Sequence, residues 1–264
     1  MTLQVPLSAA DRLQGTGAYA LELTGVSRHF GALVALSNIN MRIAAGERRA
    51  VLGSNGAGKT TLFNAVTGDF ACTTGRITLF GEDITDLPPH ERIRRGLRRT
   101  YQISQQFGGL SVLDNIYLAC RGVSRRRFSL LRPKDRDVNM AQAEMILNAV
   151  HLEADRHRLV GTLSHGQQRQ LEIALALAGA PRFILFDEPA AGLSPTERRD
   201  LVAILNALPK HIGYIIIEHD LDVALRVSEY VSMMHNGRVF KEGTPAEIEA
   251  DPEVQEIYLG GKHG

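Results

Sequence analysis

Residues 53–60 have the types and spacing of a phosphate-binding loop. They read GSNGAGKT, which matches the pattern G-x-x-x-x-G-K-[ST] in full. The apolar residues 50–52 predict the end of a buried strand before the loop, and residues 61–66 predict a helix after it. In this setting the glycines let the backbone wrap closely around phosphates, and the helix points its positive N-terminal end at the anion. The pattern therefore favours a phosphate site over an accidental glycine-rich turn.

The residues of this loop have separate expected roles. The side chain of Lys59 is expected to reach the β- and γ-phosphates of a nucleotide, and the Thr60 hydroxyl is expected to bind Mg²⁺. The residues expected to contact the nucleotide are Gly53, Ser54, Asn55, Gly56, Ala57, Gly58, Lys59, Thr60 and Thr61. The loop therefore predicts a site for a nucleotide and its metal ion.

Two apolar strands end in the polar residues that phosphoryl transfer to water needs. Residues 183–186 lead into Asp187 and Glu188, and residues 214–217 lead towards His219. Continuous apolar strands are typical of a parallel sheet covered by helices, in which ligands bind beyond the carboxyl ends of the strands. Asp187 is expected to hold Mg²⁺ through water, Glu188 to orient or deprotonate the attacking water, and His219 to contact the γ-phosphate. We therefore expect one active site at these strand ends.

The sequence evidence for two further site residues is weaker, and the assignment of the two carboxylates has an alternative. The amide of Gln102 could reach Mg²⁺ or water, and the ring of Phe30 could stack on adenine. An aromatic residue near a strand end is more often part of a core, so Phe30 is not diagnostic by itself. For Asp187 and Glu188, the rival interpretation is a turn or helix-capping cluster, which the phosphate loop upstream disfavours.

Composition describes an ordinary globular chain. Its 264 residues are 44% hydrophobic and 22% charged, with a formal net charge of +1, so no global field favours nucleic acid or membrane. The two cysteines, Cys72 and Cys120, have no metal-site spacing and suit a reducing compartment. We find neither a secretory signal nor an apolar run of bilayer length. The expected location is the cytoplasm, with any membrane role exerted through a partner.

Apolar periodicity predicts the order of the elements. Strands are expected at 19–23, 26–31, 39–43, 75–81, 100–103, 231–235 and 238–242. Helical patterns are expected at 90–99, 111–161, 163–177 and 244–264. The short alternating strands before the loop favour an antiparallel edge, and Asn236-Gly237 predicts a hairpin turn.

Two arginine-rich stretches need an interpretation. In 90–99 the basic residues are interspersed with Ile93 and Leu97, which predicts the solvated face of a helix. Residues 121–136 predict a solvated loop, with a membrane-surface contact as the alternative.

The motifs together resemble the ATP-binding subunits of ABC transporters. GSNGAGKT, TYQI, LSHGQ, FILFDEP, AAGLS and IIIEHD occur in the family order and cover 19–243. The resemblance implies an α/β fold: a P-loop NTPase core of ABC type with an antiparallel β edge and a helical subdomain. It implies ATP and Mg²⁺ as cofactors and ATP hydrolysis as the activity. The expected parts are a flexible N-terminal extension, the ATP-binding core, the helical subdomain and a helical tail, at 1–18, 19–102 with 164–243, 103–163 and 244–264.

The resemblance also implies roles that the residues alone leave open. It places Gln102 at the metal and Phe30 under the adenine. It further implies a twofold dimer in which each ATP lies between the phosphate loop of one chain and the signature of the other, so that Ser164, Gly166 and Gln167 become nucleotide contacts. Two departures stand out: His165 replaces a glycine of the usual LSGGQ, and Ser194 replaces an aspartate.

Subfamily features resemble importers of branched-chain amino acids. The runs RRTYQ, DEPAAGLSP, IIIEHD and the tail GTPAEIEADPEVQEIYLG carry this similarity. It implies a second ATPase subunit, identical or different, two membrane permease subunits, an extracytoplasmic binding protein and a place at the cytoplasmic face of the membrane. Urea importers and lipopolysaccharide exporters are the alternatives. A soluble ABC ATPase acting on nucleic acid is disfavoured by the single nucleotide-binding unit and the near-zero charge, and a non-catalytic regulator is disfavoured by the intact motif residues.

Overall fold

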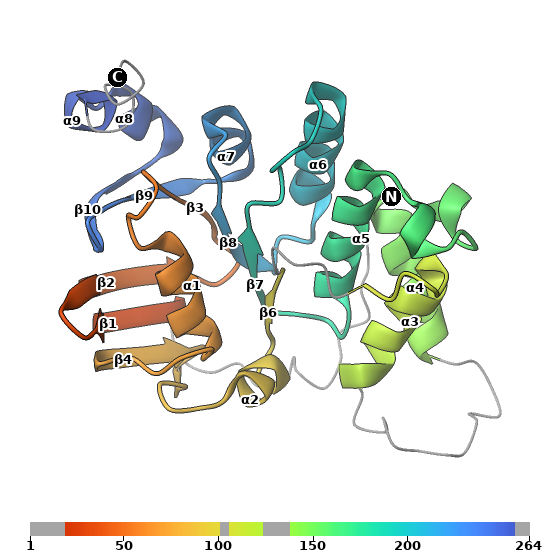
Figure 1. The fold of residues 1–264 in the computed structure, drawn as a ribbon, viewed down its shortest axis with the longest axis horizontal. Coiled ribbons are helices and arrows are strands. Elements are labelled where there is room, and N and C mark those ends of the chain that lie inside the picture. The colour runs from red at the N-terminus through yellow and green to blue at the C-terminus, as the bar shows by residue number, and fades with distance from the viewer. Residues whose placement is uncertain (1–18, 101–105, 124–137, 257–264) are drawn as a thin grey trace. The chain divides into compact units, whose positions relative to one another are not determined.

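The computed structural model describes residues 19–100, 106–123 and 138–256 (Figure 1). The chain forms two compact units, each described here by itself. One comprises Gln14–Arg99, Arg182–Glu188 and Lys210–Gly264, and the other includes Thr100–Pro181 and Pro189–Pro209. The second unit is larger than the helical subdomain expected at 103–163, because it also takes in the helices after residue 163. The 103–163 subdomain itself stays a prediction.

The first unit contains an antiparallel sheet of four strands in the order β2-β1-β4-β5. Their bounds are β1 Tyr19–Phe30, β2 Leu33–Ala44, β4 Thr74–Leu79 and β5 Glu82–Asp83. Leu21 of β1 lies opposite Ile43 of β2 on one side and Leu79 of β4 on the other, and all three are buried. Alternation of apolar and polar residues turns one face of the sheet inwards. The antiparallel edge expected from the sequence is therefore confirmed.

A second sheet of six strands has the order β10-β9-β3-β8-β7-β6. The bounds are β3 Arg48–Gly53, β6 Leu97–Arg99, β7 Phe183–Asp187, β8 Gly213–Ile217, β9 Tyr230–His235 and β10 Arg238–Gly243. All its pairs are parallel except β9 with β10. That last pair turns at Asn236-Gly237, whose φ values of 47° and 72° suit a hairpin turn. The carboxyl ends of β3, β7 and β8 consequently meet at one edge.

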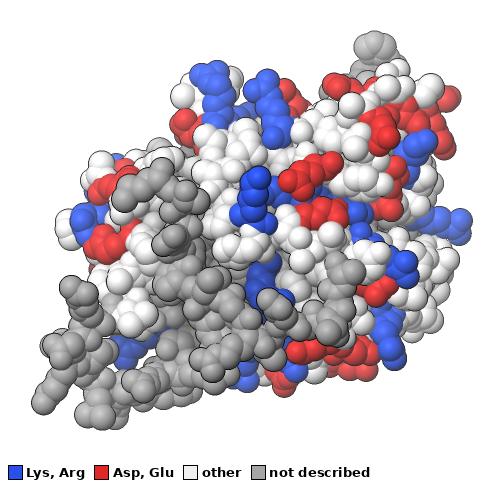
Figure 2. All heavy atoms as spheres, turned by 180° about the vertical axis from the view of Figure 1, so that it is seen from behind, with Lys and Arg blue, Asp and Glu red and all other residues white. Residues whose placement is uncertain are grey.

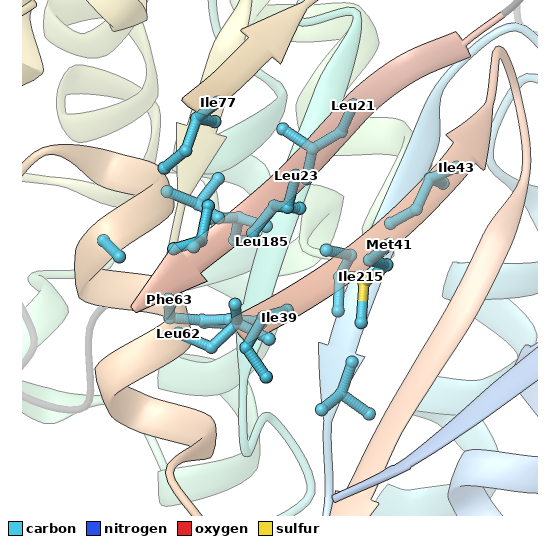
Figure 3. Packing of buried hydrophobic residues seen from close by; sticks show 14 of the residues in the cluster. Leu21, Leu23, Ile39, Met41, Ile43, Leu62, Phe63, Ile77, Leu185 and Ile215 are labelled. Carbon is cyan, nitrogen blue, oxygen red and sulfur yellow. The ribbon is translucent and has the colours of Figure 1, made fainter. Parts of the chain in front are cut away.

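Helix α1 (Lys59–Thr67) packs into the core between the two sheets (Figure 3). Its Leu62 and Phe63 are fully buried, together with Leu185 of β7 and Ile215 of β8. Burying such a side chain contributes about 1.5–3 kcal/mol. The remaining helices of this unit are α2 Pro89–Arg94, α7 Leu221–Val227, α8 Pro245–Ala250 and α9 Pro252–Val254. The core therefore fixes the helix that follows the phosphate loop.

The arginine-rich stretch 90–99 differs from the solvated helix that the sequence predicts. Helix α2 ends at Arg94, the chain turns at Gly96 with φ +93°, and β6 follows. Arg92 is 2% exposed, and its guanidinium donates to the carbonyl oxygens of Leu87, Ala65, Val66 and Thr85, each at 2.8 Å. The prediction was wrong because carbonyl groups from other segments of the chain bind Arg92, and a local charge pattern does not reveal such contacts.

The second unit is helical in its described parts. Its helices are α3 Val112–Val123, α4 Val138–Ala149, α5 His165–Leu177 and α6 Pro195–Ala207, with short 3₁₀ turns at Glu153–Asp155 and Val160–Thr162. Helix α3 packs on both α4 and α5. Within the range 111–161 expected to be helical, α3 and α4 are helices, whereas residues 150–161 form turns and the two short 3₁₀ segments. The strand expected at 100–103 and most of the basic segment 121–136 lie outside the described residues, and Thr100 itself is not in a strand.

No helix among the described residues is long and apolar enough to cross a membrane. On the face drawn in Figure 2, lysine and arginine side chains are interspersed with aspartate and glutamate. That distribution agrees with the net charge of +1.

Candidate active site

The turn from β3 into α1 requires glycine at two places. A Cβ atom on Gly53 would lie 2.3 Å from the carbonyl oxygen of Met234, and one on Gly58 would lie 2.7 Å from that of Ala35. Gly58 also has a φ of +100° and stands directly before the first residue of the helix. The hairpin supports the turn, because the Gly237 amide donates to the Ala57 carbonyl at 3.0 Å. The loop is thus held in one shape by its neighbours.

The N-terminus of α1 has no side-chain cap. Helices α5, α6 and α8 each begin with a capping box, and the side chain of Asp220 caps the N-terminus of α7. The first N–H groups of any helix lack partners within the helix, and its macrodipole makes this end positive. Helix α1 begins instead with a glycine and carries no acidic residue in its first turn. Its N-terminus is therefore suited to an anionic ligand.

Lys59 lies back over this loop. Its Nζ donates to the carbonyl oxygens of Gly53 at 2.6 Å and Ser54 at 3.1 Å, and the residue is 6% exposed. Burial lowers the pKa of the Lys59 ammonium, and the carboxylates of Glu188 and Asp187 oppose that effect. Both carboxylates are thus near enough to act on the loop lysine electrostatically.

Asp187 ends β7 as a buried carboxylate held by an arginine. Its Oδ2 accepts a hydrogen bond of 2.7 Å from Arg99, and the two side chains are 1% and 6% exposed. The same guanidinium donates to Asn64 of α1 at 2.5 Å and to Asp69 at 3.0 Å. Arg99 therefore joins the carboxylate to the helix of the phosphate loop. Sequence reasoning missed Arg99, since the arginine run around it predicted only solvated charge.

Glu188 and His219 are in direct contact beyond the ends of β7 and β8. His219 Nε2 and Glu188 Oε1 are 2.8 Å apart, with side chains 45% and 21% exposed. Glu188 has φ +50°, a conformation unusual for a residue with a side chain, and its amide donates to the Ile217 carbonyl at 2.9 Å. Strain of this kind often accumulates at functional sites. The contact holds the carboxylate against the imidazole, and both side chains stay partly exposed to solvent.

Phe30 is the last residue of β1 and is 44% exposed. An exposed aromatic ring in the unit that holds the phosphate loop is a candidate platform for a base. Gln102, the remaining candidate, lies outside the described residues.

The donors near the loop fit the way proteins bind Mg²⁺. This ion keeps several waters and takes one or two carboxylates together with substrate phosphates. The described residues hold no group of three or more His, Cys, Asp or Glu side chains that could bind a metal alone. Asp187 and the exposed hydroxyl-bearing Thr60 are oxygen donors of the required kind. They would hold the ion together with the nucleotide.

The signature residues lie in the helical unit, at the start of α5. Ser164 is the N-cap, its Oγ accepts from the Gln167 amide, and the Gln167 side chain accepts from the Ser164 amide. A Cβ on Gly166 would lie 2.2 Å from Glu197 Oε1, so the end of the Glu197 side chain would have to move to admit a larger residue. The ring of His165 lies against Gly192, where an added Cβ would approach it to 3.0 Å.

Comparison with known families decides the identity. The model described as "ABC transporter" matches residues 36–191, and the model described as "Branched-chain amino acid ATP-binding cassette transporter" matches residues 242–264. The chain belongs to the ABC transporter family. It is therefore an ATP-binding, ATP-hydrolysing subunit, as the phosphate loop and carboxylates led us to expect.

Three curated relatives of this ABC subunit are named for a role in transport. The high-affinity branched-chain amino acid transport ATP-binding protein BraF of Pseudomonas aeruginosa is 35% identical, over 91% of this chain and 97% of that protein. LivG of Escherichia coli, named for the same transport, is 32% identical over 91% and 97%. The lipopolysaccharide export system ATP-binding protein LptB of Acidithiobacillus ferridurans is also 35% identical, over 91% and 96%.

Solved structures of ABC cassettes share the fold. One, an ATP-binding cassette of an ABC transporter in its ADP conformation, is 32% identical with a TM-score of 0.79, covering 92% of this chain and all of that chain (100%). Another, a bacterial ABC transporter cassette solved as a dimer, is 25% identical with a TM-score of 0.73, covering 85% and 98%. The P-loop NTPase core of ABC type expected from the sequence is confirmed.

Proposed function

We propose that this ABC subunit drives the import of branched-chain or other hydrophobic amino acids. The observation that most directly supports this choice of cargo is the match of residues 242–264 to the branched-chain family model. This C-terminal segment lies outside the residues 36–191 matched by the general ABC model, so it is a subfamily feature. BraF and LivG, both named for that transport, agree with it.

The site residues divide the work of hydrolysis. Lys59 and the N–H groups that begin α1 bind the phosphates, and Phe30 supports the adenine. Thr60, Asp187 and Gln102 hold Mg²⁺, which when bound neutralises charge on the phosphates. Glu188 orients the attacking water and takes its proton, and His219 holds Glu188 in place through the 2.8 Å contact. In this proposal His219 also contacts the γ-phosphate.

We further propose a dimer at the cytoplasmic face of the membrane. One cassette relative was solved as a dimer. In the dimer, Ser164, Gly166 and Gln167 of one chain contact the nucleotide held by the other. The second ATPase subunit is an identical or a related chain, and the closing and opening of the pair moves two permease subunits. An extracytoplasmic binding protein supplies the cargo indirectly.

The alternative cargo that a specific observation favours is lipopolysaccharide, moved outwards. LptB is 35% identical to this chain, the same figure as for BraF. The C-terminal match to the branched-chain model makes amino-acid import the stronger proposal.

The deciding test is uptake in cells that carry Glu188→Gln in place of the natural chain. We expect uptake of labelled leucine, isoleucine and valine to be lost, while urea uptake is unchanged. The matched control is Asp222→Asn, which removes a carboxylate on α7 whose ion pair with Arg226 is exposed. Normal branched-chain uptake with Glu188→Gln would refute the cargo, and an accompanying defect in the outer membrane would favour the export alternative.

A further inference from the structure

The guanidinium of Arg28 lies over two neighbouring aromatic rings, one of which is Phe30, the expected adenine platform. Its central carbon is 4.5 Å from the ring centroid of Phe30 and 4.8 Å from that of Phe70. The two rings are themselves arranged edge to face, with centroids 5.5 Å apart and planes at 85°. Distances below about 6 Å are those of a cation–π contact. Phe30 nevertheless stays 44% exposed, so part of the ring remains open to a ligand.

A hydrogen bond holds the Arg28 side chain in this position. Its Nη1 donates to the Ala71 carbonyl at 2.8 Å. Its Nε is buried and has no hydrogen-bond partner among the described residues, so the rings supply a large part of the surroundings of this cation. The arginine is thus seated by a backbone carbonyl and two rings rather than extended into solvent.

The segment that carries Phe70 is tied both to β1 and to the end of α1. The Thr73 amide donates to the Ser27 carbonyl at 2.8 Å, and Thr73 Oγ1 accepts from the His29 amide at 3.0 Å. On the other side, the Asp69 amide donates to Asn64 of α1 at 3.0 Å. Arg28 therefore sits where the strand of the adenine platform meets the chain leaving the phosphate-loop helix.

We propose that Arg28 is a positioning residue for adenine recognition: it holds the ring of Phe30 in the orientation that stacks on the base. This inference rests on the nucleotide site of the proposed function. Phe30 ends its strand, so its ring depends on side-chain contacts for a fixed orientation. A ring fixed before binding loses less conformational freedom when the base stacks on it. Arg28 therefore contributes to affinity for the base without touching the phosphates.

A rival role for Arg28 is that of a placeholder on the face that adenine would occupy. A placeholder must leave when the nucleotide binds, and its removal would strengthen binding. The hydrogen bond to Ala71 and the second ring at Phe70 favour a permanent seat instead. The two roles predict opposite signs for the same substitution.

The test compares ATP with inorganic tripolyphosphate, which has the phosphates but no base. Dissociation constants for both are measured by calorimetry for the wild type, Arg28→Met, Arg28→Lys and Phe30→Ala. Arg42→Met is the matched control, because Arg42 lies on the same sheet, over the ring of Tyr19 at 5.5 Å, in an exposed ion pair with Glu22. Lys59→Ala shows what the loss of a phosphate contact looks like.

We expect Arg28→Met to weaken ATP binding roughly three- to tenfold, the range of a partly desolvated cation–π contact. Tripolyphosphate binding should be unchanged, which also shows that the loop is folded. Arg28→Lys should recover part of the loss, Arg42→Met should have no effect, and Arg28→Met should add little in a chain that already carries Phe30→Ala.

Four results would overturn the inference. Tighter ATP binding by Arg28→Met would make Arg28 a placeholder. Equal losses for ATP and tripolyphosphate would make it a phosphate contact, and full additivity with Phe30→Ala would separate it from the ring. A wild-type chain that binds neither ligand would overturn the nucleotide site as well. If instead every variant except Lys59→Ala binds tripolyphosphate normally, the phosphate site stands whatever the result for Arg28.

Discussion

Glu188 is the residue on which we expect the chemistry to depend most directly. Its left-handed backbone, φ +50°, and its contact with His219 aim the carboxylate to one side of the strand end. Asp187, its neighbour, turns to Arg99 and into the core. Two adjacent carboxylates thus have separate surroundings, which suits one to hold the metal and the other to handle water.

Glu188→Gln should lower kcat for ATP hydrolysis roughly 10²- to 10⁴-fold, the usual contribution of a positioned acid or base. The dissociation constant for ATP should stay the same, because the amide keeps the size of the side chain and the loop is untouched. Phosphate release at saturating ATP and calorimetric binding measure the two quantities. Asp222→Asn is the control, and a kcat within a factor of about two of the wild type would remove Glu188 from this role.

Residues of this kind are predictable from sequence when a motif includes its own structural setting. The loop, the carboxylates and His219 each follow an apolar strand, and parallel strands bring such ends together. Their roles at the nucleotide stay predictions. Arg99 was not predictable in this way, because its contact with Asp187 joins residues 88 positions apart and no local pattern marks it.

At the scale of elements, α1 is supported at both ends. Its first turn faces the phosphate loop, and Arg92 of α2 donates to the carbonyl oxygens of Ala65 and Val66 in its last turn. A cation at the C-terminus of a helix complements the macrodipole, as an anion does at the N-terminus. The buried arginine therefore stabilises the helix that must hold the nucleotide.

Arg92→Met should lower the free energy of unfolding by about 3 kcal/mol, because it leaves buried carbonyl groups unsatisfied. Urea denaturation measures the change. Arg94→Met is the matched control on the same helix: Arg94 is exposed, so we expect a change within about 0.5 kcal/mol. Equal effects of the two substitutions would mean that the hydrogen bonds of the buried Arg92 contribute no more to stability than an exposed arginine does.

Helix α6 explains the departure at Ser194. This serine is the N-cap of α6 and forms a capping box with Glu197. Aspartate and serine are about equally good at an N-cap, so the serine preserves the start of the helix at the position where the family resemblance led us to expect aspartate. The hydrogen bonds from the Ser194 hydroxyl and amide also lower the pKa of Glu197.

Ser194→Ala should cost about 1 kcal/mol of stability. Ser194→Asp should cost less than alanine, because its carboxylate still accepts from the first turn of the helix, although it cannot donate to Glu197 as the serine hydroxyl does. Thermal denaturation of the two variants beside the wild type gives the comparison. If aspartate proved as damaging as alanine, the serine would be retained for a reason other than capping.

Elements whose patterns are local were predicted well, and those set by distant contacts were not. The hairpin at Asn236-Gly237 and the helix start at Ser164 follow from residue types that suit their own backbone. The end of α2 at Arg94 was missed, since Gly96 at φ +93° outweighs the helical propensity of the surrounding arginines.

At the scale of the whole molecule, hydrolysis and transport belong to different parts. One unit holds the phosphate-loop residues, the buried carboxylate of Asp187 and the Glu188–His219 pair, whereas the signature residues Ser164 and Gly166 lie in the other unit of the chain. In the proposed dimer these residues serve the partner's nucleotide, so association should depend on ATP. The identity of the cargo cannot be predicted from these residues, because their expected contacts are with the nucleotide.

Glu188→Gln should therefore form a stable dimer with ATP and Mg²⁺, because both composite sites fill and neither is emptied by hydrolysis. Sedimentation velocity with and without ATP measures the shift from monomer to dimer. The matched control is the double variant Lys59→Ala with Glu188→Gln, which should stay monomeric because it cannot hold the phosphates. A Glu188→Gln chain that binds ATP yet stays monomeric would exclude the homodimer, and the second ATPase subunit would then have to be a different chain.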